Sequence, residues 1–393
     1  MRIAVIGCRG VPSNYSGIEK IVENLFGLMA RNGHEITVYC RPMVPRMPDD
    51  AWLGLHQKFI PAPGGKYGET VSHSILSMAH ALMRGDRLGR PFDLISLHAI
   101  APNVAAPLAA AAGIPVISHV HGLDWQREKW KGLGSRVIQL GERAMVRSAA
   151  AVVVVNRALK HYYETTYGIP TALLPNGISI TPDQLPIDTQ VLGRFHLIPG
   201  RFIVAIGRLV PEKRLQDTIG AFRRLATDFK LAIVGDGSTT PDYVRSLHEA
   251  CAGDDRIVFT GQQSGSALET LFRAAAFYVT ASELEGLPSS LLECMERGTC
   301  AIASDIPPHR ELLERVEGYD LFFPVGDVDT LTRHMQRLLS QPSQAAALGA
   351  AARRFVRREY AWPVLAERTE RFYQWVLKSE DRRNLPEFAS AGV

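Results

Sequence analysis

The sequence predicts an α/β protein with two doubly wound, parallel-sheet halves, and three observations point to this fold class. Short apolar segments rich in β-branched residues alternate with longer segments of helical periodicity, as in parallel sheets covered by helices on both faces. The alternation stops in residues 183–199, a proline-rich and weakly patterned segment, and then restarts. The chain of 393 residues is also longer than one ordinary domain.

The first half contains short apolar segments that we expect to form strands. They are residues 3–6, 35–40, 94–97, 115–119, 151–155 and 171–174, with one further strand within 52–59. Apolar residues from Ile18 to Met29 recur at helical spacing, and Gly33 closes that helix. Residues 71–83 are also expected to be helical, so strands and helices alternate through this half.

The second half repeats the alternation. Its expected strands are 202–206, 231–234, 257–260, 277–280, 300–303 and 321–324, and its expected helices are 215–227, 241–252, 266–274, 288–297 and 328–340. Residues 345–377 are predicted to be helical with one break at 361–363, and 378–393 to fray. We therefore expect an acceptor-side domain at 1–190, a nucleotide-sugar domain at 191–360, and a crossover helix and tail at 361–393.

The overall composition is typical of a soluble, cytoplasmic globular protein. Hydrophobic residues make up 46% of the chain and charged residues 21%, and the formal net charge of +4 is too mild for dedicated nucleic-acid binding. The five cysteines contain no CxxC pair, so we expect buried thiols and neither a disulfide framework nor a zinc site. The first apolar run is too short for a signal peptide, and prolines interrupt the longest apolar segment.

Residues 127–147 hold the strongest concentration of charge, with six basic and two acidic residues. Apolar residues follow a helical pattern within it. One interpretation is a core helix with a solvated basic face. The other is a surface that binds an anionic membrane, where each basic residue adds about 1 kcal/mol. The second interpretation predicts a protein peripheral to the inner face of the cell membrane.

The stretch from Ala276 to Asp305 predicts a strand, a loop, a helix and a second strand. Its loop delivers Glu285 to a helix that we expect to begin at Pro288, and Glu293 follows about two turns later. Backbone N–H groups and the helix dipole make such an N-terminus a place for an anion. The alternative is ordinary: a favourable charge at a helix start, and a surface carboxylate on its side.

A second polar loop, Gly207 to Arg214, follows the first strand of the second half. Its strand-end position places Arg208 and Lys213 where ligands of doubly wound sheets bind. Two cations there suit a diphosphate, since arginine offers a fork and lysine a point charge. A solvated loop with surface ion pairs is the alternative.

These motifs together resemble the retaining glycosyltransferases of family 4. The shared order is Gly207-Arg208, then Glu212-Lys213, then Val234-Gly235-Asp236-Gly237, and then two glutamates, Glu285 and Glu293, with seven residues between them. The similarity covers nearly the whole chain. The segment from Met1 to Glu19 and the one from His121 to Trp130 look like a bacterial subgroup of polysaccharide assembly that includes rhamnosyltransferases.

The resemblance implies the GT-B fold, with two Rossmann-like domains facing across a cleft and C-terminal helices packing back toward the first domain. It implies a nucleotide-diphosphate sugar donor, with its diphosphate on Arg208 and Lys213. Glu285 would then bind the sugar hydroxyls, and Glu293 the ribose. Backbone groups of three glycines and one leucine would complete the donor site: Gly17, Gly207, Gly286 and Leu287.

The resemblance places His121 near the donor sugar, although His98 and His119 also stand at strand ends. It implies transfer to a saccharide or lipid-linked acceptor with retention, the departing phosphate taking the proton, and no metal or cofactor. Two positions differ from the usual family pattern: Ser16 precedes Gly17, and Ser304 follows the late strand. They bear on the identity of the sugar.

Three other functions fit parts of the sequence. A GT-B sugar-nucleotide epimerase would convert the donor without an acceptor. A pyridoxal-dependent phosphorylase would need a cofactor lysine. A non-catalytic sugar-nucleotide binding protein would bind the donor without turnover.

Overall fold

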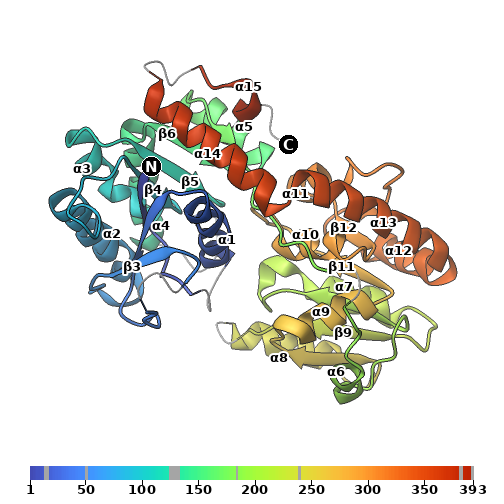
Figure 1. The fold of residues 1–393 in the computed structure, drawn as a ribbon. Coiled ribbons are helices and arrows are strands. Elements are labelled where there is room, and N and C mark those ends of the chain that lie inside the picture. Colours follow the sequence, from blue (N-terminus) through green and yellow to red (C-terminus); the bar gives the residue numbers. More distant parts are fainter. Residues whose placement is uncertain are drawn as a thin grey trace. The chain divides into compact units, whose positions relative to one another are not determined.

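The computed structural model describes residues 1–12, 17–48, 52–123, 133–182, 185–237, 240–379 and 384–390, and it divides into two compact units (Figure 1). The first unit comprises Met1–Ser179 and Tyr360–Val393, and the second comprises Ile180–Glu359. The chain therefore leaves the first unit, builds the second, and returns.

The first unit is built on a seven-stranded sheet in which every neighbouring pair is parallel. The strand order is β3-β2-β1-β4-β5-β6-β7. The strands are β1 (Arg2–Ile6), β2 (Glu35–Cys40), β3 (Leu55–Phe59), β4 (Leu94–His98), β5 (Val116–Val120), β6 (Ala151–Val154) and β7 (Ala172–Leu173). The described residues of β4 and β5 are fully buried, as the apolar segments predicted.

Helices cover this sheet. They are α1 (Gly17–Arg31), α2 (Gly65–Arg84), η1 (Ala101–Ala105), α3 (Ala106–Ala111), α4 (Leu133–Ser148), α5 (Arg157–Tyr167), α14 (Trp362–Lys378) and α15 (Glu387–Ser390). Local sequence sets their ends where a cap is present: the Asn156 side chain accepts a hydrogen bond from the Leu159 N–H at 2.7 Å, which starts α5.

The second unit contains a six-stranded parallel sheet in the order β10-β9-β8-β11-β12-β13. Its strands are β8 (Phe202–Ile206), β9 (Lys230–Val234), β10 (Ile257–Gly261), β11 (Phe277–Thr280), β12 (Ala301–Ser304) and β13 (Phe322–Phe323). Its helices are α6 (Thr189–Arg194), η4 (Pro211–Lys213), α7 (Leu215–Arg223), α8 (Pro241–Ala250), α9 (Gly265–Ala274), α10 (Ser289–Glu296), α11 (Pro307–Leu313), α12 (Val328–Ser340) and α13 (Pro342–Glu359). Two Rossmann-like parallel sheets confirm the predicted fold class.

The C-terminal helix α14 belongs to the core of the first unit. It packs against α1, and its side chains Phe372, Tyr373 and Val376 are completely buried. The returning backbone forms a parallel bridge between Ile178 and Ala361. The expectation that C-terminal helices pack back toward the N-terminal domain is confirmed for α14.

Three segments differ from the sequence analysis. The weakly patterned segment 183–199 contains a helix, α6, because Asp188 caps it and the Asp188 carboxylate accepts from the Gln190 N–H at 3.0 Å. Helix α11 was not predicted, since seven residues opening with Pro307-Pro308 are too short to show periodicity. The expected fraying of 378–393 is wrong for α15, where Ala389 is fully buried; residues 380–383 and 391–393 lie outside the described residues.

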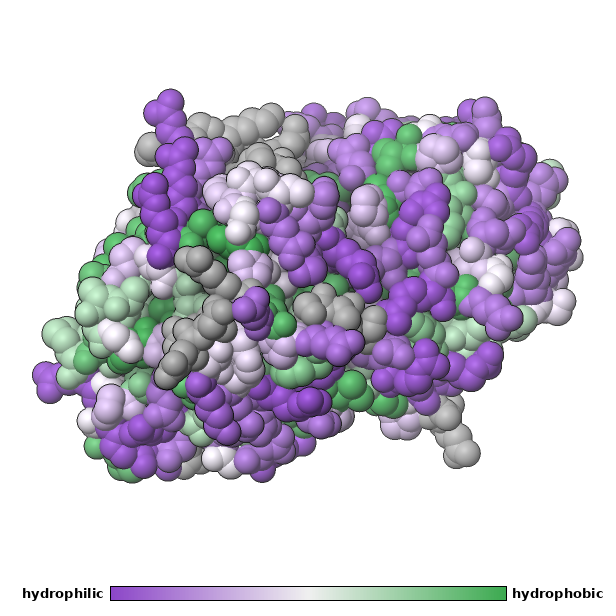
Figure 2. Space-filling model, turned by 90° about the horizontal axis from the view of Figure 1, so that it is seen from above, coloured by the Kyte–Doolittle hydropathy of each residue, from purple (hydrophilic) through white to green (hydrophobic). Residues whose placement is uncertain are grey.

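Figure 2 shows one face of the molecule, where hydrophilic side chains cover much of the surface with apolar side chains between them. In the described part of the chain, no helix has both the length and the apolar character needed to cross a membrane.

Candidate active site

The second sheet reverses its strand order between β8 and β11, and the candidate site lies at this switch point. Strand β8 is followed by β9 on one side, whereas β11 lies on the other side of β8. The loops that leave the carboxyl ends of β8 and β11 therefore run in opposite directions. Doubly wound sheets bind their ligands in the space that such loops leave open.

A backbone hydrogen bond and an ion pair connect the two loops. The Glu283 N–H donates to the Glu212 carbonyl oxygen at 2.9 Å. Arg214 adopts a left-handed backbone (φ +46°) and places its guanidinium 3.2 Å from the Glu283 carboxylate. These contacts fix the loop after β8 against the loop after β11.

Between the fastened loops, Lys213 and Glu285 form a short ion pair. The Lys213 Nζ lies 2.5 Å from Glu285 Oε1, and the two side chains are only 17% and 13% exposed. Burial raises the pKa of Glu285, but the Lys213 charge and its hydrogen bond, with help from His309 and Ser282, outweigh that effect and hold the pKa below its usual value. Glu285 is therefore ionised in this pair.

A buried polar cluster supports the pair from the neighbouring strand. The Ser304 hydroxyl, at the end of β12, donates to the Ser282 carbonyl oxygen at 2.5 Å. The His309 Nδ1 lies 2.9 Å from the Ser304 carbonyl oxygen and 3.1 Å from its hydroxyl. Ser282, Ser304 and His309 are completely buried. This cluster links the end of β12 to the loop that carries Glu285.

Two glycines allow the backbone segments that follow β8 and β9 to approach each other closely. A Cβ added to Gly235, whose φ is +153°, would lie 1.8 Å from the Gly207 carbonyl oxygen. A Cβ on Gly207 itself would lie 3.3 Å from Lys213 Cε. Larger residues at either position would push the β8 loop or Lys213 out of place.

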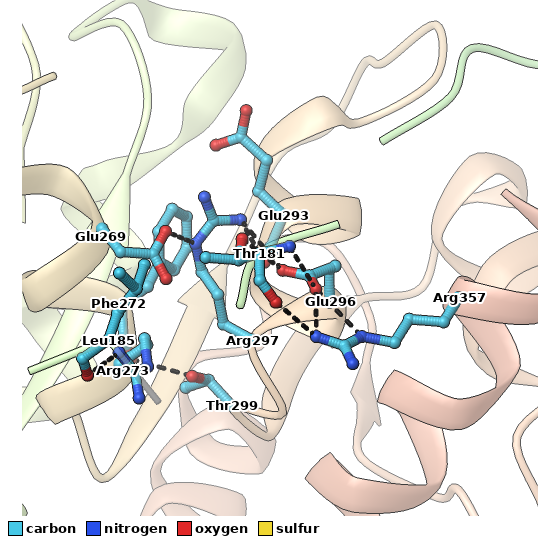
Figure 3. A network of polar contacts seen from close by, with 10 residues as sticks. All are labelled: Thr181, Leu185, Glu269, Phe272, Arg273, Glu293, Glu296, Arg297, Thr299 and Arg357. Carbon is cyan, nitrogen blue, oxygen red and sulfur yellow. Dashed lines mark hydrogen bonds and ion pairs between the residues drawn. The ribbon is translucent and has the colours of Figure 1, made fainter. Parts of the chain in front are cut away.

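The other predicted donor-site residues of this unit surround α10 and the β8 loop. Arg208 is exposed and has no ion-pair partner among the described residues. Leu287 is buried, and Gly286 precedes it in the loop after β11. Pro288 was expected as the first helical residue but lies one position before it, because α10 begins at Ser289. The Glu293 carboxylate points away from the polar network behind α10 (Figure 3).

That network centres on Glu296, a residue that the sequence analysis missed. Its fully buried carboxylate accepts hydrogen bonds from the Thr181 N–H (3.1 Å), the Thr181 hydroxyl (2.9 Å) and the Arg357 guanidinium (2.8 Å) (Figure 3). The spacing in the sequence could have indicated this role. Glu296 stands four residues after Leu292 on the apolar face of α10, where a buried carboxylate needs a partner.

The first unit contains the two remaining predicted residues, His121 and Gly17. His121 follows β5 and stacks on His98, with their rings 5.4 Å apart and His98 Nδ1 3.2 Å from His121 Nε2. Burial lowers the pKa of His121 to about 4. Gly17 begins α1, and a Cβ there would meet nothing within 4 Å. Its neighbour Ser16 lies outside the described residues.

His119 completes a stack of three histidines at the ends of β4 and β5. Its ring lies 4.6 Å from that of His98, and its Nε2 is 2.7 Å from the Tyr373 hydroxyl on α14. Burial lowers the pKa of His119 to about 3 and that of His98 well below its usual value. No group of three or more His, Cys, Asp or Glu side chains in the described ranges is arranged to hold a metal ion.

Two family models match the chain, one in each half. The model for Glycosyltransferase Family 4 matches residues 15–181, and the model for Glycosyl transferases group 1 matches residues 197–355. The second match contains the whole switch-point site.

A curated relative and a solved structure are also similar to this chain. TuaC of Bacillus subtilis, a glycosyltransferase named for teichuronic acid biosynthesis, is 27% identical over 280 residues, which cover 70% of this chain and 64% of TuaC. Sucrose-phosphate synthase from Thermosynechococcus elongatus has a similar structure, with a TM-score of 0.77 and 21% identity over 96% of this chain and 99% of that one.

A further solved structure holds a ligand. Anabaena Alr3699/HepE in complex with UDP-glucose matches with a TM-score of 0.76 and 16% identity, over 95% of this chain and 99% of its own. Its similarity bears on the fold. With a glycosyltransferase model matching each half and the two-sheet architecture shared with these structures, the chain is a GT-B glycosyltransferase.

Proposed function

We propose that this protein transfers a sugar from a nucleotide-diphosphate donor to a saccharide or lipid-linked saccharide acceptor, with retention at the anomeric carbon. The observation that carries the proposal is the Lys213–Glu285 pair at the β8/β11 switch point. It places a cation for a diphosphate and a carboxylate for hydroxyl groups side by side, at the sheet position where ligands bind.

The donor's charge sets the role of each cation. The transition state of glycosyl transfer gathers negative charge on the leaving diphosphate. In the proposal, Arg208 and Lys213 stabilise this charge, together with the backbone N–H groups of Gly286 and Leu287. Gly207 keeps Lys213 close to the end of β8. Because these groups supply the neutralising charge, the proposed reaction is independent of a metal and of a cofactor.

The carboxylates bind hydroxyl groups in this proposal. Glu285 accepts from the donor sugar and Glu293, whose carboxylate points away from the structural network, accepts from the ribose (Figure 3). For His121 and Gly17, the proposal keeps the donor-binding roles that the family resemblance implies. The departing phosphate takes the acceptor's proton, so no protein base is assigned.

Two similar proteins suggest a substrate class. One structural neighbour is bound to UDP-glucose, and one relative is named for teichuronic acid biosynthesis. We therefore propose a role in cell-surface polysaccharide synthesis. The resemblance to a polysaccharide-assembly subgroup that includes rhamnosyltransferases supports the same role. A thermal-shift screen of UDP, GDP and dTDP sugars would identify the donor, since a ligand of the native state raises Tm.

Replacing Lys213 tests the catalytic proposal. We expect Lys213→Ala to lower kcat by about 100-fold or more, because a charge-stabilising donor is worth that much in a water-excluded site. Lys230→Ala is the matched control: Lys230 opens β9 at the amino end of that strand, whereas Lys213 follows the carboxyl end of the neighbouring strand β8. Near-normal turnover by Lys213→Ala, with an unchanged Tm, would remove Lys213 from the mechanism.

We also propose that the basic segment 127–147 binds the inner face of an anionic membrane, which would bring the enzyme to a lipid-linked acceptor. Residues 124–132 lie outside the described residues, but α4 exposes Arg136, Arg143, Arg147 and Leu140. Flotation with anionic vesicles at low salt should recover the protein, and a variant with the three arginines changed to alanine should bind less. Absence of flotation by the unmodified protein refutes this proposal.

A further inference from the structure

His309 stands out among the buried polar residues of the second unit because half of its hydrogen-bonding capacity is unused. Its side chain is completely buried, and no donor among the described residues reaches its Nε2. Buried polar atoms in folded proteins nearly always have a partner. His309 is one of the exceptions in this unit, and it lies on α11, directly beyond the strand end that supports the Lys213–Glu285 pair.

The contacts of the other ring nitrogen define the tautomer. Nδ1 lies 2.9 Å from the Ser304 carbonyl oxygen, which can only accept, so Nδ1 carries the hydrogen. Nε2 must then present a lone pair. Burial lowers the pKa of His309 to about 4, so the ring stays neutral and Nε2 remains an acceptor near neutral pH.

The position of His309 connects this acceptor to the proposed donor site. Ser304 bonds to both His309 and Ser282, and Ser282 lies three residues before Glu285 in the loop after β11. The charges of Glu285 and Lys213 both act on the imidazole. His309 and Glu285 therefore belong to one connected polar cluster, joined through Ser304 and Ser282.

We infer that His309 is a specificity-determining residue, whose Nε2 accepts a hydrogen bond from one hydroxyl of the donor sugar next to the hydroxyl held by Glu285. This inference rests on the proposed function. Two neighbouring acceptors select a neutral sugar with adjacent hydroxyl groups. They disfavour a uronic acid at the same position, because its carboxylate would face lone pairs and a second carboxylate.

Deoxygenated donors test this inference. For the unmodified enzyme, removing the hydroxyl that faces Nε2 should lower kcat/KM by about 10- to 100-fold, the cost of leaving a buried acceptor unpaired. His309→Asn retains a donor for the Ser304 carbonyl oxygen but has no group at the Nε2 position. In this variant, deoxygenation at that one position should cost less than threefold, while other positions keep their penalties.

A control variant at a second histidine and an NMR measurement complete the test. His334→Asn is the matched control: His334 lies on α12 of the same unit and bonds to the Phe322 carbonyl oxygen at 2.9 Å. It should leave every deoxygenation penalty unchanged. If His309→Asn does not fold, ¹⁵N NMR of the unmodified protein serves instead. The Nε2 resonance should move on addition of the nucleotide sugar and not with the nucleoside diphosphate alone.

The possible failures are distinguishable. If the unmodified protein binds and transfers no sugar nucleotide, the proposed function fails. The inference is overturned if the protein transfers sugar but His309→Asn keeps the full deoxygenation penalty at every hydroxyl. It is also overturned if the Nε2 resonance does not change on addition of the nucleotide sugar, because His309 then does not contact the sugar.

Discussion

At the scale of single residues, one fully buried and one partly exposed glutamate in the second unit show how surroundings separate a structural carboxylate from an exchangeable one. Both oxygens of Glu296 are occupied, by Thr181 and Arg357, and its side chain has no exposed surface. Glu285 pairs with the Lys213 side chain and is 13% exposed. A ligand can compete for this partly exposed carboxylate, whereas the Glu296 side chain has no exposed surface for a ligand to contact.

Removing the Glu296 carboxylate should destabilise the second unit strongly. We expect Glu296→Ala to lower the free energy of unfolding by about 3 kcal/mol, because it leaves Arg357 and Thr181 without their acceptor. The estimate is at the low end of the range for buried pairs, since the Arg357 side chain is 24% exposed. Chemical denaturation followed by circular dichroism measures the change.

An exposed pair in the same unit provides the comparison. Glu314 pairs with Arg310 on the surface, where the two side chains are 50% and 42% exposed. Glu314→Ala should change the stability by less than about 1 kcal/mol. Equal losses for the two variants would contradict the structural role of Glu296.

At the scale of elements, the histidine stack joins the ends of β4 and β5 to helix α14. His98 and His119 are buried and stacked, and the Tyr373 hydroxyl bonds to His119 and, at 2.8 Å, to Ser96. A protonated ring in this stack would bring positive charge into a site without a carboxylate partner among the contacts described. Attachment of α14 therefore depends on neutral histidines.

Acid should weaken the first unit. The folded-state pKa of His119 (about 3) and of His121 (about 4) lies below the ordinary value near 6.5, so the unfolded chain binds more protons. Their stabilising contribution is complete above about pH 6.5 and is lost as the pH falls toward 4. For His119 the loss is about 2 kcal/mol between pH 7 and pH 5.

Tryptophan fluorescence measures this effect selectively. All five tryptophans lie in the two segments that form the first unit. The fluorescence-detected Tm should fall between pH 7 and pH 5, and His119→Gln should fall less steeply. A Tm that is constant over this range would contradict the assignment of neutral, buried histidines.

The elements also show where sequence reasoning succeeds. Strands of a parallel sheet are apolar along their whole length, so β2 and β11 were predicted to the residue. The short helices α6 and α11 have too few turns to reveal a period. Glu285 and Lys213 were each predicted as site residues, but their contact depends on the sheet order, which no local pattern contains.

At the scale of the whole molecule, the two units are built from the chain in different ways. The second unit is one continuous stretch, Ile180–Glu359, whereas the first needs two stretches separated by that entire unit. The later stretch supplies Phe372 and Tyr373, both completely buried in the first unit's core. The first unit is therefore incomplete without α14.

Separate fragments test this difference. Residues 180–359 should fold alone, with a cooperative thermal transition and dispersed amide resonances. Residues 1–179 should not, because they lack the side chains of α14, and each large apolar side chain missing from a core costs about 3 kcal/mol or more. Adding a peptide of residues 360–390 should restore the fold. A stable, cooperative fragment 1–179 on its own would refute this prediction.

The return of α14 also sets the order of events during synthesis. A ribosome adding about 5–20 residues per second needs roughly 10 to 40 s to make the second unit after Ser179 has been polymerised. Throughout this time the surface of α1 that later contacts α14 has no partner in the nascent chain. The unit made first is thus completed last, and during this interval the α1 surface is exposed to chaperones and to aggregation.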